Sequence, residues 1–143
     1  ILGAGNNVLI VSKPQLSCIK FLCKAFTIYK DNILFRFTIG SANKKVLNHW
    51  EPFAPDFWER VMSLKFAFDM GFKTSVSCEP MLDDKIEKVV TEVEDYVTDA
   101  IWLGKANKLI ERLRTNGVSD EVLSAGKKLR ENSKKKIISP MNM

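Results

Sequence analysis

Four strand-like runs recur along this chain, and a helix-like stretch follows each of them. The runs are NNVLIVSK (6–13), NILFRFTIGS (32–41), KTSVSCEPM (73–81) and DAIWLGK (99–105). Strands that alternate with helices are typical of parallel sheets, because a crossover helix must return the chain to the start of the next strand. The sequence therefore predicts an α/β fold in which four βα units form half of a TIM-type barrel, a parallel sheet with helices on its outer face.

The expected limits of the helices follow from the spacing of apolar residues, from capping residues and from helix-breaking residues. Asp56 is expected to cap one helix and Gly71 to end it. The connection 41–56 contains two prolines and is expected to be irregular. Helices are expected at 14–29, 57–70, 85–96, 108–114 and 119–130. The expected organisation is a half-barrel over 1–107, C-terminal helices over 108–133, and a disordered basic tail over 134–143.

Four βα units are too few to close a barrel of eight strands. An open parallel sheet also leaves unpaired backbone groups on its two edge strands. The chain begins at Ile1 within ILGAGNN, without an initiator methionine. We therefore expect it to be the C-terminal portion of a longer polypeptide, whose N-terminal half-barrel is its partner. A homodimer through the open sheet edges is the other expectation.

The composition narrows the class of protein. With 143 residues and 45% apolar content, the chain has enough material for one modest domain. No apolar run approaches the roughly 20 residues of a membrane span, and no signal peptide opens the chain. We expect a cytoplasmic protein without a membrane partner. The single histidine and the scattered cysteines predict no metal site and no disulfide framework, and they leave no Ser/His/Asp triad.

Polar side chains collect where the predicted strands stop, which is where parallel α/β sheets bind their ligands. Lys13 could meet a carboxylate or phosphate there, or it could be an exposed lysine in a turn. Thr38 and Ser41 suit a ribose or a carboxylate, although threonine is also a good strand residue. Glu79 has no evident structural reason to end an apolar strand and could bind a ligand or act as an acid or base. The remaining rim candidates are Arg36, Lys105 and Asn107.

The connection 41–56 and the basic C-terminal end could each have more than one role. Glu51 and Arg60 are expected to form an ion pair that fixes the connection 41–56, and nearby aromatic residues to pack that connection down. From Ser124 onward the chain is strongly basic, with Glu131 as the single acid. This end could neutralise the phosphates of a nucleic acid, or it could be a solvated, frayed helix. The basic residues are Lys127, Lys128, Arg130, Lys134, Lys135 and Lys136.

The order of three motifs resembles the radical SAM superfamily, most closely its spore photoproduct lyase-like branch. The motifs are FRFTIG (35–40), WEPFAPDFWER (50–60) and EPML (79–82), and the resemblance covers 7–107. It implies a partial β/α barrel of six strands, of which this chain holds the third to the sixth. It also implies a lyase-like enzyme that cleaves S-adenosylmethionine reductively to a 5′-deoxyadenosyl radical, with DNA among the substrates of the branch.

The resemblance assigns site residues as well. It implies that Lys13 meets the methionine carboxylate, that Thr38 meets the ribose or that carboxylate, and that Ser41, Ser77 and Glu79 belong to the cofactor site. In the superfamily a CxxxCxxC loop after the first strand holds the [4Fe-4S] cluster, and no such motif occurs here. The cluster would therefore lie in the missing half, and this portion alone would hold no cofactor.

A second function class competes with this expectation. The chain could be a catalytically silent half-barrel that binds nucleic acid or a protein through its basic end and its aromatic connection. Such a domain would bind nucleic acid with an affinity that falls steeply with salt, and it would not recognise S-adenosylmethionine.

Overall fold

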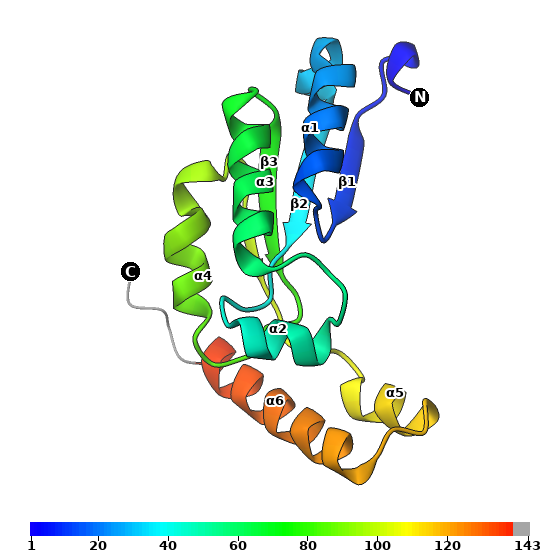
Figure 1. Cartoon of the computed structure of the whole chain (residues 1–143), viewed down its shortest axis with the longest axis vertical. Helices are drawn as coiled ribbons and strands as arrows, with labels where there is room; N and C mark the ends of the chain where they lie inside the picture. The colour runs from blue at the N-terminus through cyan, green and yellow to red at the C-terminus, as the bar shows by residue number, and fades with distance from the viewer. Residues whose placement is uncertain (139–143) are drawn as a thin grey trace.

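The computed structural model describes residues 1–138 and contains one four-stranded parallel sheet with the strand order β1-β2-β3-β4 (Figure 1). The strands are β1 (Val8–Ser12), β2 (Ile33–Thr38), β3 (Lys73–Cys78) and β4 (Ile101–Leu103). Every neighbouring pair is parallel, so a crossover joins each strand to the next. The predicted α/β fold is confirmed, and its completion into a barrel stays a prediction.

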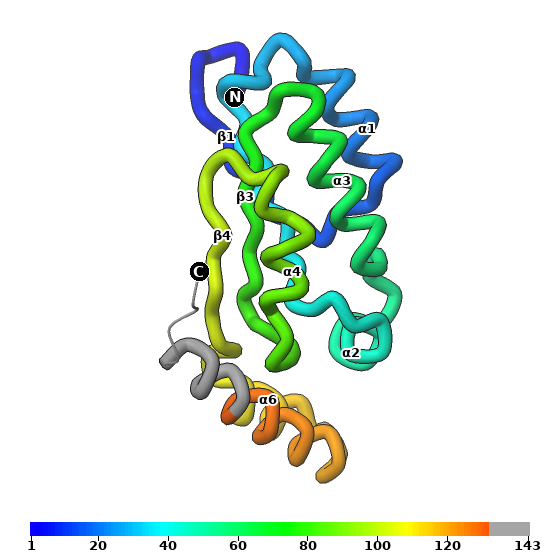
Figure 2. The backbone as a smooth tube through the Cα atoms, turned by 90° about the vertical axis from the view of Figure 1, so that its left-hand side faces the viewer, coloured from blue at the N-terminus to red at the C-terminus, as the bar shows by residue number. Residues whose placement is uncertain are grey.

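Helices cover only one face of this sheet. Figure 2 shows the sheet nearly edge-on, with α1 (Leu16–Ala25), α3 (Phe57–Asp69) and α4 (Ile86–Val93) all on the same side. The segments α2 (Lys44–Trp50), α5 (Leu109–Thr115) and α6 (Asp120–Ile138) lie beyond the carboxyl ends of the strands (Figures 1 and 2). Within 1–138, three short 3₁₀ segments complete the elements: Leu2–Ala4, Thr27–Asn32 and Glu94–Tyr96.

Burial along the strands follows from this one-sided cover. In β2, Ile33, Phe35 and Phe37 are at most 1% exposed and face the helices. The alternate residues of β2 are only half-buried, because successive side chains of a strand point to opposite faces. We call the uncovered side the bare face. From the alternation and the strand register, the residues directed to this side are Leu9, Val11, Leu34, Arg36, Thr38, Lys73, Ser75, Ser77 and Trp102. Ser75 and Ser77 are nonetheless buried, at 0% and 7% exposed.

Local sequence signals explain α3, the helix between β2 and β3, and also account for α2, a helix that the sequence analysis did not predict. Asp56 caps α3 by accepting a hydrogen bond from the Glu59 amide at 3.0 Å, and Gly71 follows with φ 80°, both as expected. The connection 41–56 is not wholly irregular, because it contains α2. The Asn43 side chain caps this helix by accepting from the Lys45 amide at 2.9 Å. Both prolines come after α2 has ended and so do not oppose it.

Three other boundaries differ from the expectation. The helix expected at 14–29 ends at Ala25, and 3₁₀ structure follows, with the Thr27 hydroxyl donating to the Cys23 carbonyl at 2.7 Å. The helix expected at 85–96 ends at Val93. The final helix extends past 130 to Ile138, while 139–143 of the predicted tail lie outside the described residues. Over 1–138, no helix combines the length and apolar character needed to cross a membrane.

We expect the isolated chain to self-associate through its uncovered edge. Val11 lies on edge strand β1 and is 57% exposed on the bare face, so pairing with a second copy would bury it. Replacing Val11 with Lys should shift the mass measured by light scattering toward that of the monomer. Met62→Lys is the matched control, because Met62 is 50% exposed on helix α3. A monomer at all concentrations in the unmodified chain would contradict this expectation.

Candidate functional site

A row of three side chains crosses the bare face near the carboxyl ends of the strands. Thr38 of β2 is in register with Ser77 of β3, and Ser77 is in register with Trp102 of β4. The hydroxyls of Thr38 and Ser77 have no hydrogen-bond partner among the described residues. In the same sheet, the Thr74 hydroxyl donates to the Tyr96 carbonyl at 2.7 Å. Thr38 is half-buried whereas Ser77 is 7% exposed, so Thr38 carries the more accessible of these two unbonded hydroxyls.

Arg36 lies on the same face two residues before Thr38 in β2, and its guanidinium has contacts on several sides. Its guanidinium carbon is 4.9 Å from the centre of the Trp102 ring. Its Nε donates to the Ser75 hydroxyl at 3.2 Å, and Nη2 lies 3.5 Å from an Asp99 carboxylate oxygen. Sequence reasoning named Arg36 but missed Trp102 and Asp99. The apolar-aromatic-apolar alternation of IWL was a signal that Trp102 points away from the core.

Glu51 and Arg60 form the ion pair that the sequence predicted. The Arg60 Nη1 is 2.7 Å from the Glu51 Oε2, and the Lys13 Nζ is 3.5 Å from the Glu51 Oε1. The Nη1–Oε2 contact is an ion pair whose angles fall short of a hydrogen bond. Lys13, the candidate cation after β1, thus faces Glu51, and its side chain keeps 41% of its exposure.

The Arg60 side chain is completely buried and holds several segments together. Its Nε donates to the Pro55 carbonyl at 2.7 Å, and its Nη1 donates to the Thr38 carbonyl at 3.0 Å. Its Nη2 has no hydrogen-bond partner among the described residues. We call Arg60 with Glu51 the Arg60 lock, because it ties the end of β2 to the connection that precedes α3.

Ser41 does not join the row on the bare face. It is 0% exposed, its hydroxyl donates to an Asp83 carboxylate oxygen, and it accepts from the Asn43 amide at 2.8 Å. Asp83 also accepts from the Lys85 amide at 2.8 Å. These bonds fasten the turn after β2 to the turn after β3, so the Ser41 hydroxyl is already occupied.

Glu79 is exposed and lies across Gly104. A Cβ on Gly104 would come within 2.7 Å of the Glu79 Cγ, so a larger residue at position 104 would require the Glu79 side chain to move. The described residues give the Glu79 carboxylate no hydrogen bond and no ion pair. Lys105 and Asn107 follow in the exposed turn after β4, and among the described residues neither forms a hydrogen bond or ion pair with Thr38 or Ser77. The structure thus gathers Arg36, Thr38 and Ser77, and it places Glu79, Lys105 and Asn107 at the rim.

The cysteines of this chain do not fit an iron–sulfur cluster. Cys18 is exposed, whereas Cys23 and Cys78 are buried. Burial raises the pKa of Cys23 to about 11, and burial together with the nearby Glu79 charge raises the pKa of Cys78 to about 12. Both thiols are therefore protonated at neutral pH when no metal is bound. No group of three or more His, Cys, Asp or Glu side chains within 1–138 could hold a metal ion.

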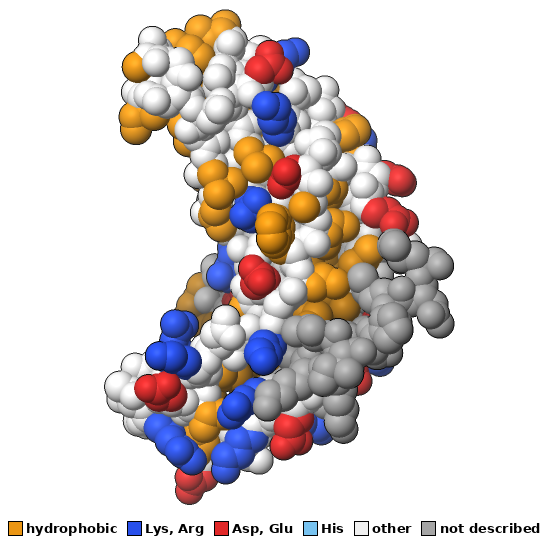
Figure 3. All heavy atoms as spheres, turned by 180° about the vertical axis from the view of Figure 1, so that it is seen from behind, with side chains coloured by type: hydrophobic (Ala, Val, Ile, Leu, Met, Phe, Trp, Pro, Cys, Tyr) orange, Lys and Arg blue, Asp and Glu red, His pale blue; other side chains and the backbone are white. Residues whose placement is uncertain are grey.

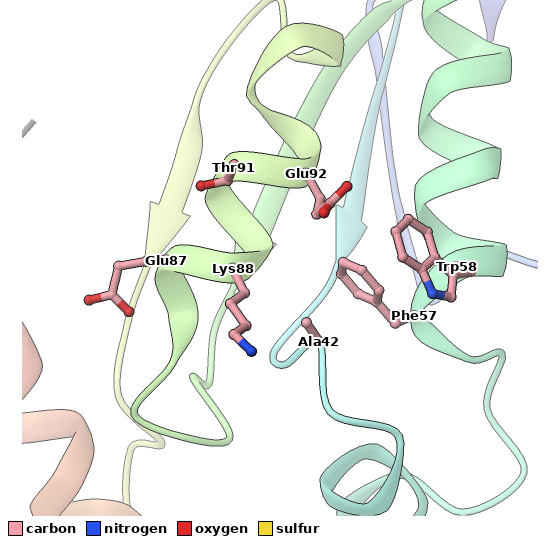
Figure 4. A pocket seen from close by; sticks show the side chains of 7 residues that line it. All are labelled: Ala42, Phe57, Trp58, Glu87, Lys88, Thr91 and Glu92. Carbon is pink, nitrogen blue, oxygen red and sulfur yellow. The ribbon is translucent and has the colours of Figure 1, made fainter.

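A separate groove lies on the helical side of the sheet. It has a volume of about 470 Å³ and is lined by Ala42, Phe57, Trp58, Glu87, Lys88, Thr91 and Glu92 (Figure 4). The rings of Phe57 and Trp58 meet edge to face at 5.1 Å, and Figure 4 shows Glu92 facing them from α4. None of the predicted site residues lines this groove, so it is distinct from the row on the bare face.

Comparison with protein-family models, with curated proteins and with solved structures finds no match for this chain. The resemblance to radical SAM enzymes therefore stays a prediction from the sequence motifs.

We expect loss of the Arg60 guanidinium to destabilise the fold strongly. Arg60→Ala leaves the mostly buried Glu51 carboxylate with only the half-exposed Lys13 and leaves two backbone carbonyls without their donor, which should cost about 3–5 kcal/mol. Urea unfolding followed by circular dichroism measures this change. Lys65→Ala is the matched control, because Lys65 pairs with Asp69 on the exposed side of the same helix. Equal midpoints for the two variants would show that the Arg60 lock contributes nothing special.

Proposed function

We propose that this chain supplies the C-terminal half of a radical SAM barrel, and that its bare face forms one wall of the cofactor and substrate cavity. The polar character of the bare face carries this proposal. Parallel strands covered on both faces carry apolar side chains on both. Here β2 and β3 direct the half-buried Arg36 and Thr38 and the buried Ser75 and Ser77 to the side away from the helices. A face of this kind suits a cavity that holds a polar ligand better than a layer of packed helices.

The chain's own residues suit S-adenosylmethionine as that ligand. The free hydroxyls of Thr38 and Ser77 can bond the ribose hydroxyls or the methionine carboxylate. Lys13 is partly exposed and can turn from Glu51 to a ligand carboxylate, because Arg60 remains to balance the Glu51 charge. In the proposed enzyme, S-adenosylmethionine supplies the radical chemistry when it is bound, and the residues named here hold and orient it.

Because the cysteines of this chain lack the CxxxCxxC spacing, the proposed enzyme must bind its iron–sulfur cluster through another part of the protein. In this proposal the N-terminal half-barrel carries it, on cysteines that precede Ile1 in a longer polypeptide. Reading the coding DNA upstream of the Ile1 codon tests this point directly. An in-frame strand followed by CxxxCxxC is the expected result, and a stop codon just upstream would contradict the proposal.

We expect S-adenosylmethionine to perturb the bare face in an NMR titration of the chain. The amide signals of Arg36, Thr38 and Ser77 should shift with added cofactor. Thr38→Val keeps the β-branched shape but removes the hydroxyl, so it should weaken binding by about fivefold, the loss of roughly one hydrogen bond. Thr91→Val is the matched control, because Thr91 is an exposed threonine on α4. No shift at any of the three sites would count against the bare face as the cofactor wall.

Nucleic acid binding is the second candidate function, either as substrate recognition by the proposed enzyme or as the role of a catalytically silent domain. Figure 3 shows Lys and Arg side chains, with acidic ones among them, on the lobe that α5 and α6 form below the sheet. The exposed basic residues here, within 105–131, are Lys105, Lys108, Arg112, Arg114, Lys127, Lys128 and Arg130. They outnumber the acids Glu111, Asp120, Glu121 and Glu131.

If this lobe binds phosphates, affinity for a mixed-sequence single-stranded DNA oligonucleotide should fall steeply between about 50 and about 200 mM salt. Fluorescence anisotropy measures it. Lys127→Glu with Lys128→Glu should weaken binding and reduce the salt slope. The control is Lys44→Glu with Lys45→Glu, which changes two exposed lysines on α2 by the same charge. Equal losses in both double variants would mean that net charge alone matters.

A further inference from the structure

The groove between α3 and α4 sets a carboxylate opposite an exposed indole ring. Trp58 is 58% exposed and Phe57 5% exposed, and their rings meet edge to face at 5.1 Å on the α3 side of the groove. Figure 4 shows the Glu92 carboxylate facing these rings from α4. Among the described residues, this carboxylate has no ion pair and no hydrogen bond. The groove thus offers two groups that attract a cation.

Farther along the seam between α3 and α4, the chain fills the same kind of arrangement with a cation of its own. The Lys65 Nζ lies 5.0 Å from the centre of the Tyr96 ring and 2.9 Å from an Asp69 carboxylate oxygen. The ring face is negative and the carboxylate adds a full charge, so the two attract the same cation. A ring with a neighbouring carboxylate therefore holds a cation in this fold.

The bare face repeats the arrangement with a guanidinium. Arg36 lies 4.9 Å from the centre of the Trp102 ring, and its Nη2 lies 3.5 Å from an Asp99 carboxylate oxygen. At Trp58 and Glu92 the ring and the carboxylate are present, but no described side chain supplies the cation. This difference points to a cation from another molecule.

Lys88 lines the same groove without supplying that cation. Figure 4 shows its ammonium directed toward Ala42 and away from the Glu92 carboxylate. Lys88 precedes Glu92 by four residues on α4, and a lysine on the N-terminal side is the weaker order for such a pair on a helix. The Glu92 carboxylate is therefore left to a ligand.

The surface around the groove favours a protein as the source of the cation. Trp58 and Met62 are 58% and 50% exposed one turn apart on α3, and both residue types are enriched at protein interfaces. Residues 83–95 contain six acids and two lysines, although the whole chain has a net charge of +5. A basic protein surface complements this acidic segment. The six acids are Asp83, Asp84, Glu87, Glu92, Glu94 and Asp95.

We propose that this groove receives an arginine side chain of a basic protein partner, with the guanidinium between Trp58 and Glu92. Arginine fits better than lysine, because a planar guanidinium can stack on an indole while it donates to a carboxylate. The groove volume of about 470 Å³ also leaves room for the aliphatic stem. This inference does not depend on the proposed function, because the groove lies on the helical side, opposite the bare face.

Titration with a capped glycine–arginine–glycine tripeptide tests the site, with the tryptophan indole N–H signals followed by NMR. The Trp58 signal is expected to shift. The Trp102 signal should stay, because Arg36 already stacks on that ring. The control tripeptide carries citrulline, which has a neutral urea of similar shape in place of the guanidinium. It should bind at least about threefold more weakly, the combined loss of a cation–π contact and an exposed ion pair.

Variants of the chain test the two groups separately. Trp58→Ala should weaken binding of the arginine peptide at least about twofold, through loss of the cation–π contact. Glu92→Gln keeps the size of the side chain and should weaken binding about twofold. Glu94→Gln is the matched control, because Glu94 is an exposed carboxylate that does not line the groove, and its affinity should be unchanged.

The contrary outcomes are equally definite. Equal affinity for the arginine and citrulline peptides would overturn the proposal, and so would a Trp58 signal that does not move. Equal losses in Glu92→Gln and Glu94→Gln would mean that net charge alone attracts the peptide. Binding of free arginine without binding of the capped peptide would overturn the assignment to a protein partner. Should Trp58→Ala fail to fold, the two peptides on the unmodified chain decide the question.

Discussion

The buried guanidinium of Arg60 is the interaction on which the carboxyl end of this sheet depends. Burying a charge costs several kcal/mol unless the charge is paired and its donors are used. Arg60 meets most of that condition with the Glu51 carboxylate and with the carbonyls of Pro55 and Thr38, and among the described residues only its Nη2 lacks a partner. A lysine could not replace it, because a single ammonium cannot reach acceptors in the diverging directions that the planar guanidinium spans. The Thr38 backbone is held in place as a result.

The bare face follows from a second constraint, the handedness of parallel crossovers. A right-handed crossover places its helix on a fixed side of the sheet. Consecutive strands in the order β1-β2-β3-β4 therefore send α1, α3 and α4 to one side and leave the other uncovered. The side chains match this geometry, since β2 buries its phenylalanines under the helices and turns Arg36 and Thr38 outward. The polar row thus lies on the face that the crossover handedness leaves without helices.

What could be predicted from the sequence was mostly local. The strands, the Asp56 cap and the Glu51–Arg60 pair depend on residues that lie close along the chain or on a simple period. Helix α2 was missed because the prolines that follow it outweighed the Asn43 cap. The stack of Arg36 on Trp102 could not be foreseen, because it depends on the register of three strands. The role of Ser41 likewise depends on Asp83, which only the folded turns bring near.

The bare face has an apolar part and a polar part. We expect the apolar part to contact protein and the polar part to bind a ligand. On β1 it is apolar, with Leu9 and Val11 exposed beside an unpaired strand edge. The opposite side of β1 opens on a groove of about 510 Å³, lined by Ile1, Leu2, Gly3, Val8, Ile10, Phe26, Tyr29 and Ile33. Apolar surface on both sides of an open edge fits the addition of protein, a strand with its helix. From β2 to β4 the same face is polar and holds an ordered aromatic stack, which fits a small ligand. A protein neighbour at β1 would therefore wall in the ligand surface without covering it.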